Sequence, residues 1–399
     1  MDTERIAAQA RELGIRRVHM LAWRDLADVE AGGSEIHAAN IAKRWAEAGL
    51  EVTMRTSYAQ GHAPVVERDG YRVVRRAGRY LVFPRAVLSE LAERHGRWDA
   101  VVEIWNGVPF FSPLWSWLRG RPHLVFLHHL HAEMWRMVLP ENPRLARAGE
   151  LLEARVAPLA YRRTRVVTLS ESSKRELVRE MGLPAVRIDV VPPGIDACFS
   201  PGGERSAAPL VVAVGRLVPV KRYDVLLRVL ARVKQDHPDL EAVIVGEGYE
   251  QPAIEALRGE LGAASWVHLH GRLSQGELVD LYRRAWVLAS ASAREGWGMT
   301  VTEAAACATP AVVTRIAGHE DAVVDGDTGL LADAAGEDGL VAALGSVLAD
   351  DVLRKQLAEG ALVHAERFTW DATAAGTLAA LVKAASTKRF GRAQAHIRA

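Results

Sequence analysis

Short runs of apolar, mostly β-branched residues alternate along the chain with longer stretches whose apolar residues recur at helical spacing. This alternation predicts strands joined by helices, and therefore an α/β protein with parallel sheets. In the first half, helices are clearest at 34–48 and 173–181. The strands predicted there are 17–22, 51–56, 71–75, 100–104, 123–127 and 165–169.

The pattern stops near residue 200 and then starts again. Residues 190–200, VVPPGIDACFS, run from a strand end into two prolines and a glycine, and the following Pro-Gly-Gly at 201–203 is typical of a linker. Beyond it the sequence predicts a helix at 223–237 and strands at 210–214, 242–245, 267–269, 287–289 and 311–314. Because no internal repeat is visible, two Rossmann-like halves joined near residue 200 are the simplest arrangement.

Composition narrows the class of protein. A chain of 399 residues is too long for one ordinary core, so roughly two or three domains are expected. Lys and Arg number 50 against 49 Asp and Glu, and this balance does not indicate a nucleic-acid partner. The two cysteines, Cys198 and Cys307, are too few for a disulfide framework and indicate a reducing compartment. With no signal peptide and no run of about 18 apolar residues, the sequence favours a soluble, cytoplasmic protein.

The most informative segment is 293–306, AREGWGMTVTEAAA, which follows a predicted strand and ends in an Ala-rich helix. Gly296 and Gly298 allow a tight turn and a close approach of the backbone to a ligand. The helix that should begin near residue 299 or 300 offers N–H groups and a positive dipole end to an anion. With Glu295 and Glu303 on either side, the segment suits a sugar–phosphate ligand. The alternative is a plain turn with two solvated acids.

A second motif, VGRLVPVK at 214–221, lies where a predicted parallel strand ends, the edge at which open α/β sheets bind ligands. Arg216 offers a fork for phosphate oxygens and Lys221 a compact point charge. The alternative is a pair of solvated surface cations. Weaker signals are the Gly-x-Gly at 246–248, usually a plain turn, and Gly271–Arg272 after another strand.

Two motifs of the first half carry candidate chemistry. In AGGSE at 31–35, two glycines lead into a helix whose expected N-cap is Ser34, and a simple turn is the usual interpretation of such a glycine pair. In FLHHLHAEMW at 126–135, the histidines at 128, 129 and 131 could bind a metal, with Glu133 the only carboxylate nearby. The alternative is that these loop histidines are structural.

These motifs and their order resemble the retaining glycosyltransferases of family 4, which have the GT-B fold. The resemblance implies two Rossmann-like, doubly wound domains facing a central cleft. Residues 1–200 would form the acceptor side and 201–370 the nucleotide-sugar side. Residues 371–399 would form a helix that crosses back to the first domain, followed by a basic tail.

The resemblance also implies roles for residues. His128 and Glu295 would contact the donor sugar, Glu303 the ribose, and Arg216 and Lys221 the diphosphate. Thus the implied catalytic residues are His128, Arg216, Lys221 and Glu295. The implied donor-binding residues are Gly33, Gly215, Arg272, Gly296, Trp297, Gly298, Met299, Thr300 and Glu303.

The activity so implied is transfer of a hexosyl unit from a UDP- or GDP-sugar to an acceptor hydroxyl with retained configuration, and with neither metal nor other cofactor. The acceptor stays open between a glycan, a lipid carrier and a small metabolite. An epimerase of the same fold and a non-catalytic nucleotide-sugar-binding protein are alternatives. A glycosidase would have no use for two phosphate-binding cations, and a dehydrogenase would need a GxGxxG motif.

Two details depart from the family pattern or lie outside it. Where the family usually has Lys-Gly, this chain has Lys221-Arg222, which leaves the shape of that loop open. The last residues, 387–399, carry several basic and no acidic side chains. We expect a frayed, solvated tail there, with contact to anionic lipid as the alternative.

Overall fold

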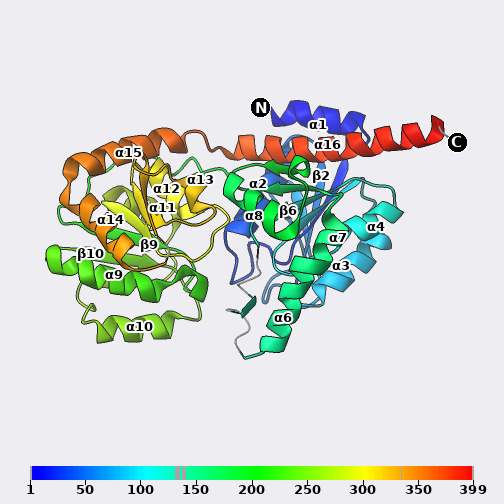
Figure 1. Cartoon of the computed structure of the whole chain (residues 1–399). Coiled ribbons are helices and arrows are strands. Elements are labelled where there is room, and N and C mark those ends of the chain that lie inside the picture. Colours follow the sequence, from blue (N-terminus) through cyan, green and yellow to red (C-terminus); the bar gives the residue numbers. More distant parts are fainter. Residues whose placement is uncertain (1, 131–134, 137–140, 334, 398–399) are drawn as a thin grey trace. The chain divides into compact units, whose positions relative to one another are not determined.

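The structure is a computed structural model that describes residues 2–130, 135–136, 141–333 and 335–397. The chain divides into two compact units, shown in Figure 1. Unit 1 comprises Met1–Gly194 and Trp370–Ala399, and unit 2 comprises Ile195–Thr369. The sequence prediction put the divisions at 200 and 370, so the first structural division lies slightly earlier in the chain.

Unit 1 is built on an eight-stranded sheet of order β3-β4-β2-β1-β5-β6-β7-β8. Its strands are β1 (Arg17–Leu21), β2 (Glu51–Thr56), β3 (Val65–Arg68), β4 (Tyr71–Arg75), β5 (Ala100–Trp105), β6 (His123–Leu127), β7 (Arg165–Thr168) and β8 (Ile188–Val190). All neighbours are parallel except the edge hairpin β3–β4. The six strands predicted here are confirmed. The hairpin strand β3 was not predicted, because its half-polar residues lie at the sheet edge.

Helices cover both faces of this sheet. They are α1 (Thr3–Glu12), α2 (Gly33–Glu47), α3 (Val82–Leu91), α4 (Ser112–Leu118), α6 (Pro143–Leu151), α7 (Ala157–Tyr161), α8 (Glu171–Met181) and α16 (Trp370–Ile397). On one face α1, α2 and α16 share a core with Val18 and Met20 of β1. On the other, α3 and α4 share a core with Leu21 and Val101.

The last helix belongs to unit 1 although it follows unit 2 in the chain. It packs against α1 and α2, and the Trp45 indole N–H donates to the Ala374 carbonyl at 2.9 Å. The segment expected to fray is helical in the structure, because α16 continues to Ile397. No helix within the described residues is long and apolar enough to cross a bilayer.

Unit 2 has a six-stranded, all-parallel sheet of order β11-β10-β9-β12-β13-β14. Its strands are β9 (Leu210–Val214), β10 (Glu241–Val245), β11 (Val267–His270), β12 (Val287–Ser290), β13 (Ala311–Thr314) and β14 (Gly329–Ala332). This is the Rossmann strand order, and the predicted α/β, doubly wound fold is confirmed. The five predicted strands are present, whereas the short edge strand β14 begins with glycine and was missed.

The helices of unit 2 are α9 (Tyr223–Asp236), α10 (Gln251–Glu260), α11 (Gln275–Arg284), α12 (Met299–Ala306), α13 (His319–Ala322), α14 (Asp338–Ala349) and α15 (Asp351–Ala365). The connections after β9 and β12, two neighbouring strands, lead in opposite directions along the sheet. Open α/β sheets bind ligands beyond the carboxyl ends of the strands at such a switch point. In unit 1 the corresponding neighbours are β1 and β5.

Candidate active site

The loops after β9 and β12 bring Lys221 and Glu295 together at the switch point of unit 2. The Lys221 Nζ lies 2.5 Å from the Glu295 Oε1, and the Ser292 hydroxyl donates to the same oxygen at 2.8 Å. Both side chains are mostly buried, 21% and 16% exposed. Burial acts to raise the pKa of Glu295, but Lys221, His319 and the Ser292 hydrogen bond together hold it below its ordinary value. Glu295 is therefore a carboxylate near neutral pH.

The loop that carries Arg216 packs directly against the Gly-x-Gly turn after β10. A Cβ on Gly246 would lie 1.9 Å from the Gly215 carbonyl oxygen, and one on Gly248 would lie 2.1 Å from that of Leu217. The Leu217 amide donates to the Glu247 carbonyl at 2.9 Å. The sequence interpretation of this turn as an ordinary one was therefore incomplete, because its glycines allow the phosphate-site loop to close.

The two candidate phosphate-binding cations differ in their surroundings. Arg216 is exposed, and its guanidinium forms no ion pair within the described part of the chain, whereas Lys221 is already paired with Glu295. The departure from the family pattern at Arg222 has a clear geometry: the residue is left-handed, with φ 50° and ψ 46°. A glycine would adopt that conformation with little strain.

The start of α12 has the properties predicted for an anion site. Gly298 is left-handed with φ 102°, and the helix begins at Met299. The amides of Met299 and Thr300 donate to no group among the described residues, as expected for the first turn of a helix. The adjacent Gly296 is buried.

Trp297 plays a different part from the one predicted. Its side chain is only 3% exposed and packs edge-on against Phe368, with ring centroids 5.0 Å apart. The indole N–H points to the Thr302 hydroxyl at 3.4 Å. The side chain thus belongs to the core of unit 2, and only the backbone of Trp297 is left for a ligand.

Sequence reasoning missed His319, at the start of α13. This buried histidine donates from Nδ1 to the Thr314 carbonyl at 2.9 Å, and its ring lies against the loop, 3.1 Å from where a Cβ on Gly298 would be. Burial lowers the pKa of His319, so the ring is neutral and its Nε2 is an acceptor. The one signal in the sequence is position, because its loop follows β13, the strand beside β12.

Glu303 lies on α12, where the Tyr282 hydroxyl donates to its Oε2 at 3.3 Å. Burial raises the pKa of Glu303 to about 7, with a further contribution from Asp196, while the Tyr282 hydrogen bond acts in the opposite direction. The residue is a sparsely paired carboxyl with lone pairs to offer to hydroxyl donors.

This raised pKa should be visible in stability. Above the ordinary pKa of Glu and up to about pH 7, the folded protein holds a proton that the unfolded chain has released. Stability therefore falls as pH rises through this window. We expect the free energy of unfolding of Glu303→Gln to exceed that of the wild type by up to about 3 kcal/mol near pH 8. Below about pH 4.5 the two proteins should be equally stable. Thermal unfolding over this range is the measurement, and identical pH profiles for the two proteins would contradict the shift.

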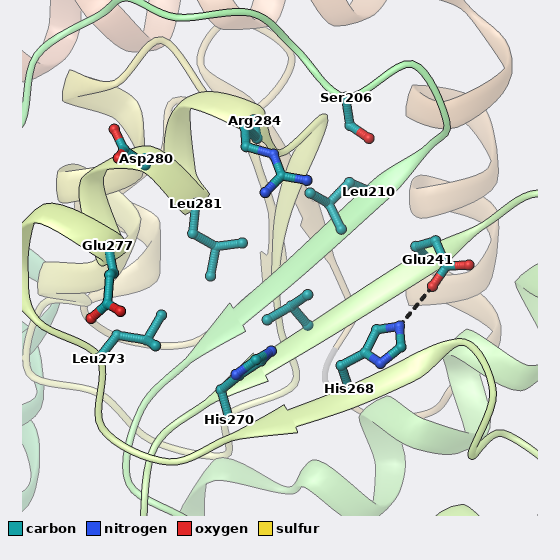
Figure 2. A pocket seen from close by; sticks show the side chains of 11 residues that line it. Ser206, Leu210, Glu241, His268, His270, Leu273, Glu277, Asp280, Leu281 and Arg284 are labelled. Carbon is teal, nitrogen blue, oxygen red and sulfur yellow. Dashed lines mark hydrogen bonds and ion pairs between the residues drawn. The ribbon is translucent and has the colours of Figure 1, made fainter.

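Arg272 follows the edge strand β11, and its guanidinium is 64% exposed at 3.9 Å from the Glu247 carboxylate. A hollow of about 460 Å³ opens nearby, along β10, β11 and α11 (Figure 2). It is lined by residues such as His268, which pairs with Glu241 at 2.9 Å, and by none of the predicted site residues. We therefore assign the candidate site to the loop cluster around Lys221.

In unit 1, the predicted His128 follows β6 and contacts His37 of α2. The His128 Nε2 lies 3.2 Å from the His37 Nδ1, and the two rings are perpendicular. Both are buried, and burial, helped by His128, lowers the pKa of His37 well below its ordinary value. Among the described residues, the His37 Nε2 has no hydrogen-bond partner.

This arrangement selects a tautomer for His37. A proton on its Nε2 would be a buried N–H without an acceptor, which is costly, whereas a proton on Nδ1 is donated to His128. With this tautomer, the His128 Nε2 accepts the hydrogen bond from His37. His37 was missed because nothing in the local pattern indicates its distant partner.

The glycine loop before α2 is held by a buried ion pair. The Glu35 carboxylate accepts from the Gly32 amide at 2.8 Å and from the Ser34 hydroxyl at 2.9 Å, and pairs with Arg24 at 3.3 Å. The N-cap is therefore Gly32, which corrects the prediction of Ser34; the helix begins at Gly33. The Gly33 amide donates to no described residue, as expected for the first residue of a helix.

The histidine cluster was also weighed as a metal site. Within the described residues, no three His, Cys, Asp or Glu side chains lie close enough together to hold a metal ion. His131 and Glu133 lie outside those residues.

Comparison with known proteins shows the family of the chain. The family model described as Glycosyltransferase Family 4 matches residues 31–199, and that described as Glycosyl transferases group 1 matches 197–363. A D-inositol 3-phosphate glycosyltransferase from Acidothermus cellulolyticus is 32% identical, over 92% of this chain and 88% of the relative.

Solved structures show the same fold. Sucrose-phosphate synthase from Thermosynechococcus elongatus superposes with a TM-score of 0.77 at 20% identity, over 90% of this chain and 96% of that one. Anabaena HepE in complex with UDP and glucose superposes with a TM-score of 0.69 at 19% identity, over 89% of this chain and 96% of that one. From the matching family models and the relative aligned over nearly its whole length, the chain belongs to glycosyltransferase family 4 and is a GT-B glycosyltransferase.

Proposed function

We propose that this glycosyltransferase moves a hexosyl unit from a nucleoside diphosphate sugar to an acceptor hydroxyl, with retention of anomeric configuration. The observation that carries the proposal is the Lys221–Glu295 pair at the switch point of unit 2, beside the first amides of α12. Cation, carboxylate and helix N-terminus together match a diphosphate joined to a sugar. Glu303 would hold the ribose hydroxyls.

In the proposed reaction the bond between the sugar C1 and the diphosphate oxygen breaks as the acceptor oxygen bonds to C1 on the same face. The departing diphosphate gains negative charge, which Arg216, Lys221 and the amides at the start of α12 would stabilise. The acceptor proton goes to a diphosphate oxygen, so no separate protein base is required.

We propose that His128 makes a polar contact with the transferring sugar, and that His37 acts on His128 as a positioning residue. His37→Leu should then lower kcat by roughly 5- to 100-fold, the equivalent of losing one oriented hydrogen bond. His37→Asn keeps an N–H near the Nδ1 position and should recover part of the loss. Steady-state kinetics at several pH values measure this. If both variants lost thermal stability but kept the wild-type kcat, the role would be structural only.

The two cations that we propose for the leaving group, Arg216 and Lys221, support a reaction without a divalent metal. We therefore expect activity to persist in EDTA. Loss of activity in EDTA and its recovery with magnesium would contradict this part of the proposal.

The printed names of similar proteins supply the first substrates to try. HepE was solved with UDP and glucose, and the relative from Acidothermus is named for D-inositol 3-phosphate. The test is to incubate the protein with UDP- and GDP-sugars, with and without inositol phosphate or other polyol acceptors. Release of nucleoside diphosphate only with acceptor, and a product of retained configuration by NMR, supports transfer. Turnover of donor without acceptor would instead indicate hydrolysis or epimerisation.

A further inference from the structure

Two neighbouring helices of unit 1 expose apolar side chains where a helix normally exposes polar ones. Leu88 on α3 is 64% exposed, and Trp117 and Leu118 on α4 are 70% and 68% exposed. Of the twenty large apolar side chains that the described residues expose, six lie here: Tyr80, Leu81, Leu88, Leu114, Trp117 and Leu118. We call these six residues the α3–α4 surface. Such clustering distinguishes it from the scattered apolar residues of an ordinary surface.

The six side chains lie on, or just before, two helices that cover the same face of the sheet. The inward residues of both helices, such as Phe83 and Trp115, share a single core with the same face of the sheet. The ends of the helices are joined because the Arg119 guanidinium donates to the Leu91 carbonyl. Figure 1 shows α3 and α4 as neighbours. Their outward stripes therefore point away from the same sheet face.

The charged side chains that these two segments expose have one sign. The exposed charged side chains within 76–97 and 111–122 are Arg76, Arg85, Arg94, Arg97 and Arg119. The acids in these segments are already used, since Glu90 is buried against His19 and Glu93 pairs with Arg121 at 2.7 Å. The α3–α4 surface is thus an apolar stripe bordered by arginines.

We propose that the α3–α4 surface docks unit 1 onto an anionic lipid bilayer. Trp117, Leu118 and Leu88 would enter the boundary between headgroups and acyl chains, and Arg85 and Arg119 would lie at the level of the phosphates. A second copy of the chain is a poorer occupant, because a two-fold contact through this face would set arginines against arginines. The inference goes beyond the proposed activity and does not depend on it.

The test is co-sedimentation of the full chain with vesicles of phosphatidylcholine alone and of equal parts phosphatidylcholine and phosphatidylglycerol. We expect binding to the anionic vesicles that added salt weakens. Leu88→Gln/Trp117→Gln should bind roughly ten-fold more weakly or worse. Val352→Gln/Val363→Gln on α15 is the matched control, since both valines are 64% exposed, and it should bind as the wild type does.

Three further variants complete the design. Trp117→Gln alone should show the same direction of effect with a smaller structural change, Arg85→Gln/Arg94→Gln should weaken binding most at low salt, and removal of residues 387–399 should leave most of the binding intact. The proposal is overturned if the wild type ignores anionic vesicles, if Leu88→Gln/Trp117→Gln binds them equally well, or if only the tail deletion abolishes binding. It is also overturned if light scattering shows a dimer that the apolar variant dissociates.

Discussion

Replacing Lys221 with methionine is expected to lower kcat by about 100- to 1000-fold, the usual cost of removing one group that stabilises developing negative charge. The Lys221 ammonium lies 2.5 Å from the Glu295 Oε1. It has further protons that it can donate to phosphate oxygens. Steady-state transfer kinetics with saturating donor measure the effect. The methionine keeps most of the length of the side chain, so packing changes little.

Lys355→Met is the matched control. Lys355 also pairs with a carboxylate, Asp351, at 2.6 Å, but its side chain is 76% exposed on α15. An exposed pair of this kind contributes about 0–1 kcal/mol to stability, and activity should be unchanged. If Lys221→Met remained within a few-fold of the wild-type kcat, the assignment of Lys221 to the leaving group would be wrong.

Asp25→Asn is expected to lower the free energy of unfolding of unit 1 by about 3–5 kcal/mol, because it leaves a buried guanidinium without its charge partner. Asp25 accepts from the Arg75 Nε and Nη2 at 2.9 and 2.8 Å, and from the Arg68 Nη1 at 2.9 Å. The side chains of Asp25 and Arg75 are 1% and 2% exposed. This cluster secures the segment after β1 that leads to the glycine loop.

The pH dependence of this effect has a definite sign. Burial acts to raise the pKa of Asp25, but Arg75 and Arg68 outweigh it and hold the pKa below its ordinary value. The contribution to stability is therefore present above the ordinary pKa of Asp and disappears as pH falls through the lowered one. The difference between variant and wild type should shrink in strong acid.

Urea unfolding followed by tryptophan fluorescence measures the loss of stability caused by Asp25→Asn, since eight of the eleven tryptophans lie in unit 1. Asp371→Asn is the matched control, because Asp371 also pairs with an arginine, Arg44, but is 81% exposed. Equal effects of the two substitutions would contradict the account of a buried, mutually dependent pair.

The strands were predictable because buried parallel strands read as continuous β-branched runs, as in LVVAV of β9. Edge strands β3 and β14 lack that signature, and their pairing depends on neighbours that the local sequence does not reveal. Among site residues, Lys221 and Glu295 were predicted because each follows a strand at the ligand-binding edge. That they meet, although 74 residues apart, is a consequence of the strand order.

The residues that were missed or given another role have a common physical cause. His37 and His319 act through partners or neighbours that only the folded chain brings close, and a single histidine in a helix carries no local mark of this. Trp297 was predicted to bind the donor because it lies within the motif. A large aromatic side chain next to an apolar core is stabilised by burial, and the Trp297 ring packs against Phe368 instead. Motif membership locates the loop but does not say which side chains point outward.

Ligand-induced thermal stabilisation tests most directly the claim that the loop cluster of unit 2 binds a nucleoside diphosphate. UDP, GDP, ADP and dTDP would each be added to the wild type, Lys221→Met, Glu303→Ala and Lys355→Met. A nucleotide present at 100 times its Kd stabilises by about 2.7 kcal/mol. We expect one nucleotide to raise the melting temperature of the wild type and Lys355→Met but of neither site variant. A shift equal in all four proteins, or no shift with any nucleotide, would contradict the account.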